Sequence, residues 1–212
     1  MTPELVERWH DHVQPLIDSN YVHWAPGVAP EKVRADKFWN WHFNFTLLAL
    51  HNTFLASKSK QHGEGLAMCI VFRSEDGADE FPIGMLTAVP KLNSNIHGIK
   101  RQRAFTWYLS DAPEEVYRWI LGIPPIQGVA KTLLDCSIQA ALDEGEDGNL
   151  LLKADPQGGT KLEGFYKHCG MKQLPKRHPA VTHLFRRHST DKYFNFLASE
   201  SLTFCAKFNN RR

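Results

Sequence analysis

The sequence lacks the features that mark several classes of protein. Its four cysteines are widely spaced and form no CxxC pair, which argues against a disulfide framework and against a zinc site. Neither sign of charge dominates, because 25 Lys and Arg face 23 Asp and Glu and leave a formal net charge of +2. No global field therefore requires a nucleic acid or an anionic membrane as partner.

Long apolar runs and leader-like segments are missing as well. Nowhere do eighteen consecutive apolar residues occur, and the first twenty residues carry charges without the apolar stretch of a secretory signal. The cysteines lie inside apolar runs, as expected of reduced, buried thiols. These absences predict a soluble, cytoplasmic protein with no membrane partner.

The eleven histidines do not form a pattern typical of a metal site. His10 and His12 are two positions apart and would face different directions on a helix, while His42 and His51 belong to separate elements. Cys169 is small and apolar in its context, so we expect burial rather than nucleophilic catalysis. We therefore expect no metal cofactor.

Hydrophobic periodicity divides the first part of the chain into helices and strands. Thr2 as N-cap and Pro3 in the first turn predict a helix over residues 3–18, and a second helix is expected over 30–43. Four apolar or alternating runs then predict largely antiparallel strands. These runs are 45–57, 66–74, 80–90 and 103–110.

The second part of the chain alternates between helices and strands. Helices are expected over 112–121, 129–144 and 160–169, the last ended by Gly170, with strands over 149–154, 171–174 and 180–187. This order predicts an α/β (α+β) fold with a mixed, mostly antiparallel sheet flanked by helices. We expect one compact domain with three segments: a helical segment 1–44 packed on the core, a core 45–188 and a tail 189–212.

The stretch "GIPPIQGVAKTLLDCSIQAAL", residues 122–142, begins as a glycine turn and continues as a helix. Unpaired amides at the start of such a helix converge on one point where the helix dipole favours negative charge. Gly128 permits close approach to the main chain, Ala130 leaves the next turn uncluttered, and Lys131 adds a cation. A pyrophosphate would fit there; the alternative is that Gly128 only caps a buried helix.

The order of strand, glycine turn, long helix, strand and a helix carrying "GFYKHCGM" resembles the GCN5-related N-acetyltransferase (GNAT) superfamily. The family motif Q/R-x-x-G-x-G/A falls on residues 125–130, where Gly128 and Ala130 match and Pro125 replaces the leading Gln or Arg. The resemblance implies acetyl-CoA as cosubstrate, bound by the main chain and side chains of this turn. The implied contacts are Gln127, Gly128, Val129, Ala130, Lys131 and Thr132.

A second family signature, roughly N-x-x-A-x-x-F-Y-x-x-x-G-F, falls on "GTKLEGFYKHCGM" and matches Phe165, Tyr166 and Gly170. By the resemblance, Tyr166 is the general acid that protonates the departing thiolate; the alternative is an aromatic residue that packs at the edge of the core. Gly159 stands where the family often has an Asn that contacts pantetheine, and Thr160 could supply a substitute hydrogen bond.

The resemblance also implies that pantetheine inserts between two splayed strands, here 103–110 and 149–154, with Leu109 and Ser110 close to the thioester. An amine would then attack the acetyl carbonyl directly. Asp111, at the end of the first strand, is the candidate base, although a helix cap is its alternative role. The predicted function is acetyl-CoA-dependent N-acetylation of a small amine or of a protein or peptide amine.

Two other functions stay open. Basic clusters at 98–103, 175–179, 185–188 and 209–212 favour a GNAT-fold toxin or effector that acetylates aminoacyl-tRNA or a host protein, with RNA as partner. The altered positions Pro125 and Gly159 favour a non-catalytic binding protein of the same fold. The alternating aromatics Trp39, Trp41, Phe43 and Phe45 indicate either core packing or the wall of an apolar acceptor pocket.

Overall fold

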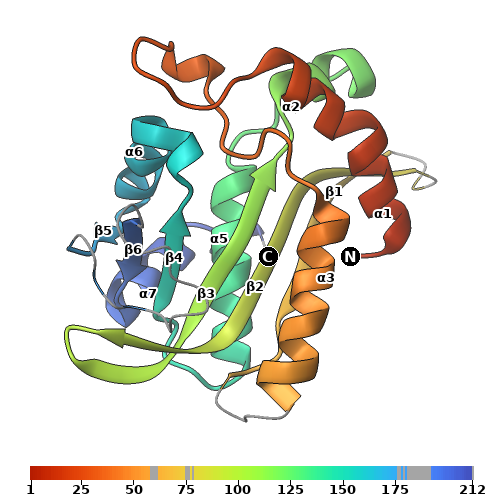
Figure 1. The fold of residues 1–212 in the computed structure, drawn as a ribbon. Helices are drawn as coiled ribbons and strands as arrows, with labels where there is room; N and C mark the ends of the chain where they lie inside the picture. Colours follow the sequence, from red (N-terminus) through yellow and green to blue (C-terminus); the bar gives the residue numbers. More distant parts are fainter. Residues whose placement is uncertain are drawn as a thin grey trace.

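A computed structural model describes residues 1–57, 62–74, 77, 79–175, 178, 180 and 192–211, and in these residues one sheet is flanked by helices (Figure 1). Its six strands have the order β1-β2-β3-β4-β6-β5, and only the pair β3 and β4 is parallel. The predicted mixed, mostly antiparallel sheet is confirmed. The strands are β1 (Leu66–Arg73), β2 (Glu80–Ile96), β3 (Ile99–Asp111), β4 (Leu150–Ala154), β5 (Lys172–Gln173) and β6 (Lys192–Phe196).

The N-terminal helix starts where the cap residue predicts. The Thr2 hydroxyl accepts a hydrogen bond from the Leu5 N–H at 3.4 Å, and Pro3 occupies the first helical position. Helical structure then continues through α1 (Pro3–Arg8), a π-helical stretch Trp9–Val13 and α2 (Gln14–Asn20). Its buried side chains recur every three to four residues, so one face packs on the sheet.

The predictions of a second helix over 30–43 and of a strand over 45–57 are both wrong. Residues 30–43 contain only a short 3₁₀ turn, Pro30–Lys32, before α3 (Trp41–His51) begins and continues as a π-helical stretch, Asn52–Ala56. The Asn40 side chain caps α3 by accepting from the Phe43 N–H at 3.0 Å. The run is apolar on nearly every side, so neither the helical nor the strand period stands out in the sequence.

The expected segment limits do not coincide with the ends of elements. The limit between residues 44 and 45 falls inside α3. Within the expected tail 189–212, β6 pairs with β4 along its whole length, and α7 (Ala198–Ala206) packs against the sheet through Phe204 and Phe196. The tail thus completes the sheet. Of the strand expected over 180–187, only residue 180 lies within the described residues.

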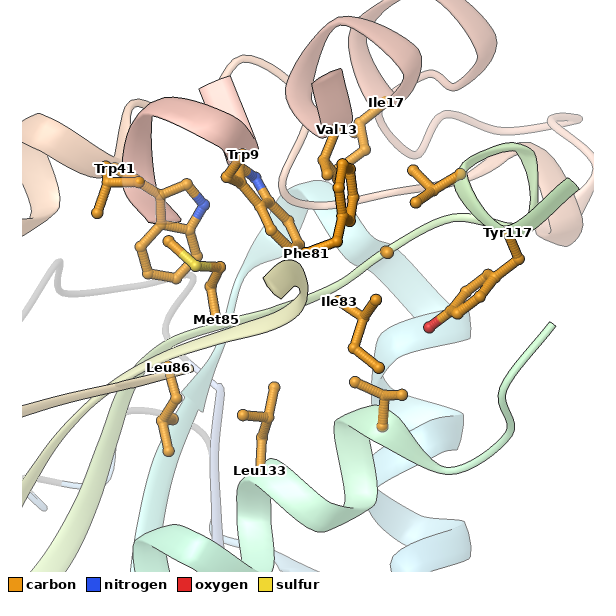
Figure 2. Packing of buried hydrophobic residues seen from close by; sticks show 14 of the residues in the cluster. Trp9, Val13, Ile17, Trp41, Phe81, Ile83, Met85, Leu86, Tyr117 and Leu133 are labelled. Atoms are coloured by element: carbon orange, nitrogen blue, oxygen red, sulfur yellow. The ribbon is translucent and has the colours of Figure 1, made fainter. Parts of the chain in front are cut away.

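The core forms on both faces of β2, with the N-terminal helices on one side and α5 (Val129–Asp143) on the other (Figure 1). Figure 2 shows Met85 next to Trp41, whereas Leu133 approaches β2 from the α5 side. Trp41 therefore packs in the core, and Trp39 contacts Tyr108 of β3 edge-on, with ring centroids 5.2 Å apart. Phe43, in contrast, is exposed.

All four cysteines are free thiols. Cys169 and Cys205 are buried as expected, whereas Cys69 and Cys136 are only half-buried. Across the described ranges, no helix is both long and apolar enough to span a bilayer.

Candidate functional site

The strands β3 and β4 part toward their carboxyl ends. They pair at Ala104 with Leu150, Phe105 with Leu151 and Thr106 with Leu152, whereas β3 runs on to Asp111 (Figure 1). The predicted splay is therefore present, and it leaves main-chain groups at the end of β3 without β4 as partner. Two polar side chains of β3 follow there, Ser110 and Asp111.

A cavity of about 270 Å³ opens at this splay. Four parts of the chain form its walls: the ends of β3 and β4, the helix α6 (Gly159–Cys169), the first turn of α5 and the loop at 33–36. Its lining includes Arg34, Asp36, Leu109, Ser110, Asp111, Ala130, Lys161, Phe165 and Tyr166. Of the predicted site residues, five therefore meet here.

The first turn of α5 is held against β2 by a close contact. A side-chain carbon on Gly84 would lie only 2.7 Å from Cγ1 of Val129, so glycine at this strand position lets the helix approach. Gly128 precedes the helix with φ of +87°, a left-handed conformation that favours glycine. The Thr132 N–H donates to the Gly128 carbonyl at 2.9 Å, so the amides of residues 129–131 come before the first intrahelical bond.

A second hollow lies over this helix start. It is lined by Gln127, Gly128, Ala130, Lys131, Lys207 and Phe208, and it shares Asp111, Ala130 and Phe165 with the first cavity. The two spaces therefore adjoin. Free amides, a helix N-terminus and two lysines make this end of the cleft suited to an anion.

Lys207 is a site residue that the sequence analysis missed. It follows α7, whose last turn brings it next to Phe204, and its Nζ lies 5.9 Å from that ring centroid. No motif surrounds it. Lys207 reaches the site only because α7 packs beside α5, and no local sequence pattern indicates this packing.

Tyr166 lies in the wall of the first cavity and is 7% exposed. Its ring packs against Phe165 and Phe194, with centroids 5.5 and 5.3 Å away. Burial raises the pKa of its phenol, and the nearby Cys169 and Asp155 raise it further. The hydroxyl therefore stays protonated near neutrality, as a proton donor requires.

A buried ion pair occupies the opposite wall. Arg34 donates to both carboxylate oxygens of Asp36, at 2.8 and 2.6 Å, and also to the main-chain carbonyl (2.5 Å) and carboxylate (3.2 Å) of Asp111. The Ser110 hydroxyl donates to Asp36 as well. Burial alone would raise the pKa of Asp36, but the charge and hydrogen bonds of Arg34 outweigh it and hold that pKa below its ordinary value.

Arg34 and Asp36 are also absent from the predicted site. Their sequence, "RAD", lies in a segment predicted to be helical, and nothing in it indicates a contact with β3. Asp111 was predicted as a base; in the structure its half-exposed carboxylate is an ion-pair partner of Arg34.

The loop before Arg34 is fixed to the start of α6. The Trp24 N–H donates to the Gln157 carbonyl at 2.8 Å, and Lys161 Nζ donates to the Val33 carbonyl at 2.8 Å. Gly159 has φ of +51°, and a side-chain carbon there would lie 2.1 Å from Cγ of Trp24. The indole thus takes the space that a side chain at 159 would need.

Two predicted cofactor contacts are not brought into these cavities. Thr160 is exposed on the first turn of α6, and Thr132 turns its hydroxyl toward the Gly128 carbonyl at 3.2 Å. Neither residue lines the two hollows. The side chain of Val129 points into the core, so only its main chain is available there.

The described basic cluster, 98–103, lies far from the cleft. It forms the hairpin between β2 and β3, at the opposite end of β3 from Asp111, roughly 25 to 40 Å away along an extended strand. Arg101 pairs with Asp147 at 2.6 Å, and buried Arg103 donates to the Ser94 hydroxyl at 2.7 Å. The clusters at 175–179, 185–188 and 209–212 fall partly or wholly outside the described residues.

The helix predicted over 112–121 is present as a π-helical stretch, Val116–Leu121, ended by Gly122 in the left-handed conformation. It contacts the N-terminal helical segment where the Tyr21 hydroxyl donates to Glu115 at 2.9 Å.

The described part of the chain contains no group of three or more His, Cys, Asp or Glu residues placed to bind a metal ion.

No protein-family model matches this chain, and no curated protein matches it. Solved structures do. The KacTA–DNA complex matches at 12% identity over 90% of this chain and 96% of that chain, with a TM-score of 0.47. A tyrosine-to-phenylalanine mutant of the AtaT toxin, bound to the C-terminus of the antitoxin AtaR and to acetyl-CoA, matches at 14% identity over 77% and 85%, with a TM-score of 0.40. These structures are similar to this chain at low identity and low TM-score, so the chemistry of this chain rests on its own residues.

Proposed function

We propose that this protein is an acetyl-CoA-dependent N-acetyltransferase in which an amine attacks the acetyl group directly. The observation that carries the proposal is the continuity of the cleft: the anion-suited hollow at the start of α5 adjoins, through Ala130 and Phe165, the cavity whose wall contains Tyr166. A molecule with a diphosphate at one end and a reactive group at the other fits this arrangement.

The diphosphate would lie at the glycine turn. In the proposal, the main-chain N–H groups of Gln127 to Lys131 donate to phosphate oxygens, and Lys131 and Lys207 supply cations. Pro125 removes the side chain that the family motif places first, but main-chain donors need no particular side chain. Thr132 and Thr160 stay predicted contacts with less support, because neither side chain lines the cleft.

The reacting group would lie at the splay. Acetyl-CoA supplies an activated acyl thioester when bound. Leu109 and Ser110 belong to the part of β3 that has parted from β4. The main chain of Leu109 faces away from β2 and is available to hydrogen-bond to the pantetheine arm or the acetyl oxygen, whereas the main chain of Ser110 faces β2, opposite Met85. Tyr166 donates its phenolic proton to the sulfur as the thiolate leaves.

Asp111 is proposed to take the proton of the acceptor ammonium, directly or through a water. Its side chain is 43% exposed, so an acceptor can reach it, and it lines both hollows. Arg34, itself held by Asp36, fixes the position of this carboxylate. The acceptor is a small amine or a peptide amine.

An aminoacyl-tRNA acceptor has little support, because the described basic cluster 98–103 lies at the far end of β3 and its arginines already have partners. A non-catalytic protein of the same fold would bind coenzyme A in the same cleft but would not transfer the acetyl group.

The test combines binding with turnover. Coenzyme A at 100 times its Kd should stabilise the protein by about 2.7 kcal/mol, measured as a thermal shift, and acetyl-CoA with a panel of amines should release free thiol. Stabilisation without thiol release would favour the binding protein. No stabilisation at millimolar coenzyme A would contradict both.

A further inference from the structure

We infer that Lys161 is an acetyl acceptor within this chain, so that the protein acetylates a lysine in the wall of its own cavity. This modification site rests on the proposed function. Lys161 lies on the first turn of α6 and lines the same cavity of about 270 Å³ as Tyr166. An amine of the chain therefore borders the space in which the acetyl group would be transferred.

The helix α6 turns the side that carries Lys161 toward the cavity. Residues four apart lie on one face of a helix. Lys161 and Phe165 have this spacing, as do Leu162 and Tyr166, and all four residues line the cavity. A flexible four-carbon stem lets the amine reach a large part of a space of this size.

The end of the Lys161 side chain is held at the cavity wall. Its Nζ donates to the Val33 carbonyl at 2.8 Å, and this contact is partly buried although the residue as a whole is exposed. Val33 lines the cavity together with Arg34 and Asp36, which follow it in the chain. The hydrogen bond uses one of the three N–H donors of an ammonium group, and the stem can rotate to turn the nitrogen inward.

The surroundings favour the neutral amine, which is the nucleophilic form. Partial burial lowers the pKa of Lys161, and the positive charge of Arg34 lowers it further. The carboxylates of Asp111, Asp36 and Glu31 act in the opposite direction without reversing the shift. A larger share of this lysine is therefore neutral at a given pH than of a solvated lysine.

The transfer uses the groups of the proposed mechanism. Nζ of Lys161 gives one proton to Asp111, whose charge acts on it, and its lone pair then forms a C–N bond to the acetyl carbon as the C–S bond breaks. Tyr166 donates its proton to the sulfur, and the second proton that the nitrogen releases restores the phenol. The products are acetyl-lysine, coenzyme A with a free thiol, and the proton passed from Asp111 to solvent.

The modification acts on the cavity that produces it. Acetylation removes the charge at Nζ and leaves one N–H donor in place of three. The added acetyl group also takes up space that an external amine needs. Protein preincubated with acetyl-CoA should therefore turn over external amines more slowly than fresh protein, and undiminished turnover after complete modification would contradict this self-limitation.

Peptide mapping by mass spectrometry tests the inference. With acetyl-CoA and no other amine, Lys161 should become acetylated at a rate that does not depend on protein concentration, and Lys161→Arg should lack the modification. Tyr166→Phe should slow it by about 10² to 10⁴. An equal rate in Tyr166→Phe, a rate that rises with protein concentration, or acetylation of Lys153 in the same cavity instead would overturn the inference.

Two other results separate this modification from the proposed function. Thiol release with a panel of amines, without acetyl-Lys161 in the unaltered chain, would overturn the inference and leave the proposed function standing. No stabilisation by millimolar coenzyme A would contradict both.

The reactivity of Lys161 can also be measured without any cofactor. In competitive labelling with a trace of acetic anhydride, Lys161 should react faster than Lys167, which is exposed on α6 and does not line the cavity. The reason is the larger share of neutral amine at Lys161. Equal or slower labelling of Lys161 would count against its role as acceptor.

Discussion

The two ends of the cleft differ in how their polar groups are held. At the α5 end, the available donors are main-chain amides, the half-buried Lys131 and the exposed Lys207, and the left-handed Gly128 precedes these amides. At the other end, the buried carboxylate of Asp36 holds Arg34 and Ser110 in one network. The first end tolerates changes of side chain because its donors belong to the backbone. The second end depends on each member, because removing one leaves a buried charge unpaired.

The largest effect is expected at Tyr166, in the wall of the first cavity. Tyr166→Phe should lower kcat by about 10² to 10⁴, because it removes the proton donor and keeps the ring that packs between Phe165 and Phe194. Steady-state kinetics measure the loss, and calorimetry should find the affinity for coenzyme A unchanged. Unaltered turnover would leave Tyr166 only a packing role.

At the network end, Asp36→Ala should destabilise the fold by about 3–5 kcal/mol, because Arg34 stays buried without its main partner. Chemical denaturation measures this. Asp111→Ala removes the half-exposed partner of the same arginine and should cost less than about 1 kcal/mol. Similar losses in the two variants would contradict the contrast between buried and exposed partners.

At the α5 end, Gly128→Val should weaken coenzyme A binding about tenfold, since an L side chain at this φ costs about 1–2 kcal/mol and displaces the amides. Gly122→Val is the matched control, because Gly122 has a similar φ of +65° at the end of another helix. It should lose stability and keep affinity. If both variants bind alike, the glycine turn does not form the binding site.

Smaller effects are expected from the lysines. Lys131→Ala and Lys207→Ala should each weaken coenzyme A binding roughly threefold to fivefold, and added salt should erase the difference because exposed charges are screened. Pantetheine, which lacks the diphosphate, should bind equally to all variants. Lys167→Ala, on the exposed side of α6, serves as control.

The smallest effect at neutral pH concerns the titration of Asp36. Its folded pKa lies below the ordinary value of 3.8, so its contribution to stability is complete above about pH 4 and is lost as the pH falls through the folded pKa. Unfolding free energies measured from pH 6 to pH 2 should fall more steeply than those of Asp36→Asn. Parallel curves would mean that the ion pair adds no stability.

Residues that line the cleft can be predicted from the sequence only where a local pattern marks them. Gly128, Ala130 and Tyr166 follow from local patterns, since a glycine turn before a helix and an aromatic pair before a C-cap glycine are readable over a few residues. Arg34 and Asp36 meet Ser110 and Asp111 across more than seventy residues, and no local pattern encodes such a contact. The helix α3 was misread because its apolar residues surround the axis.

Gly159 and Trp24 constrain each other although they lie far apart in the sequence. No side chain fits at position 159 while the indole fills the same space, and the left-handed backbone adds strain of its own. A substitution at Gly159 therefore requires a smaller residue at position 24, and a smaller residue at position 24 would leave an empty space beside the start of α6.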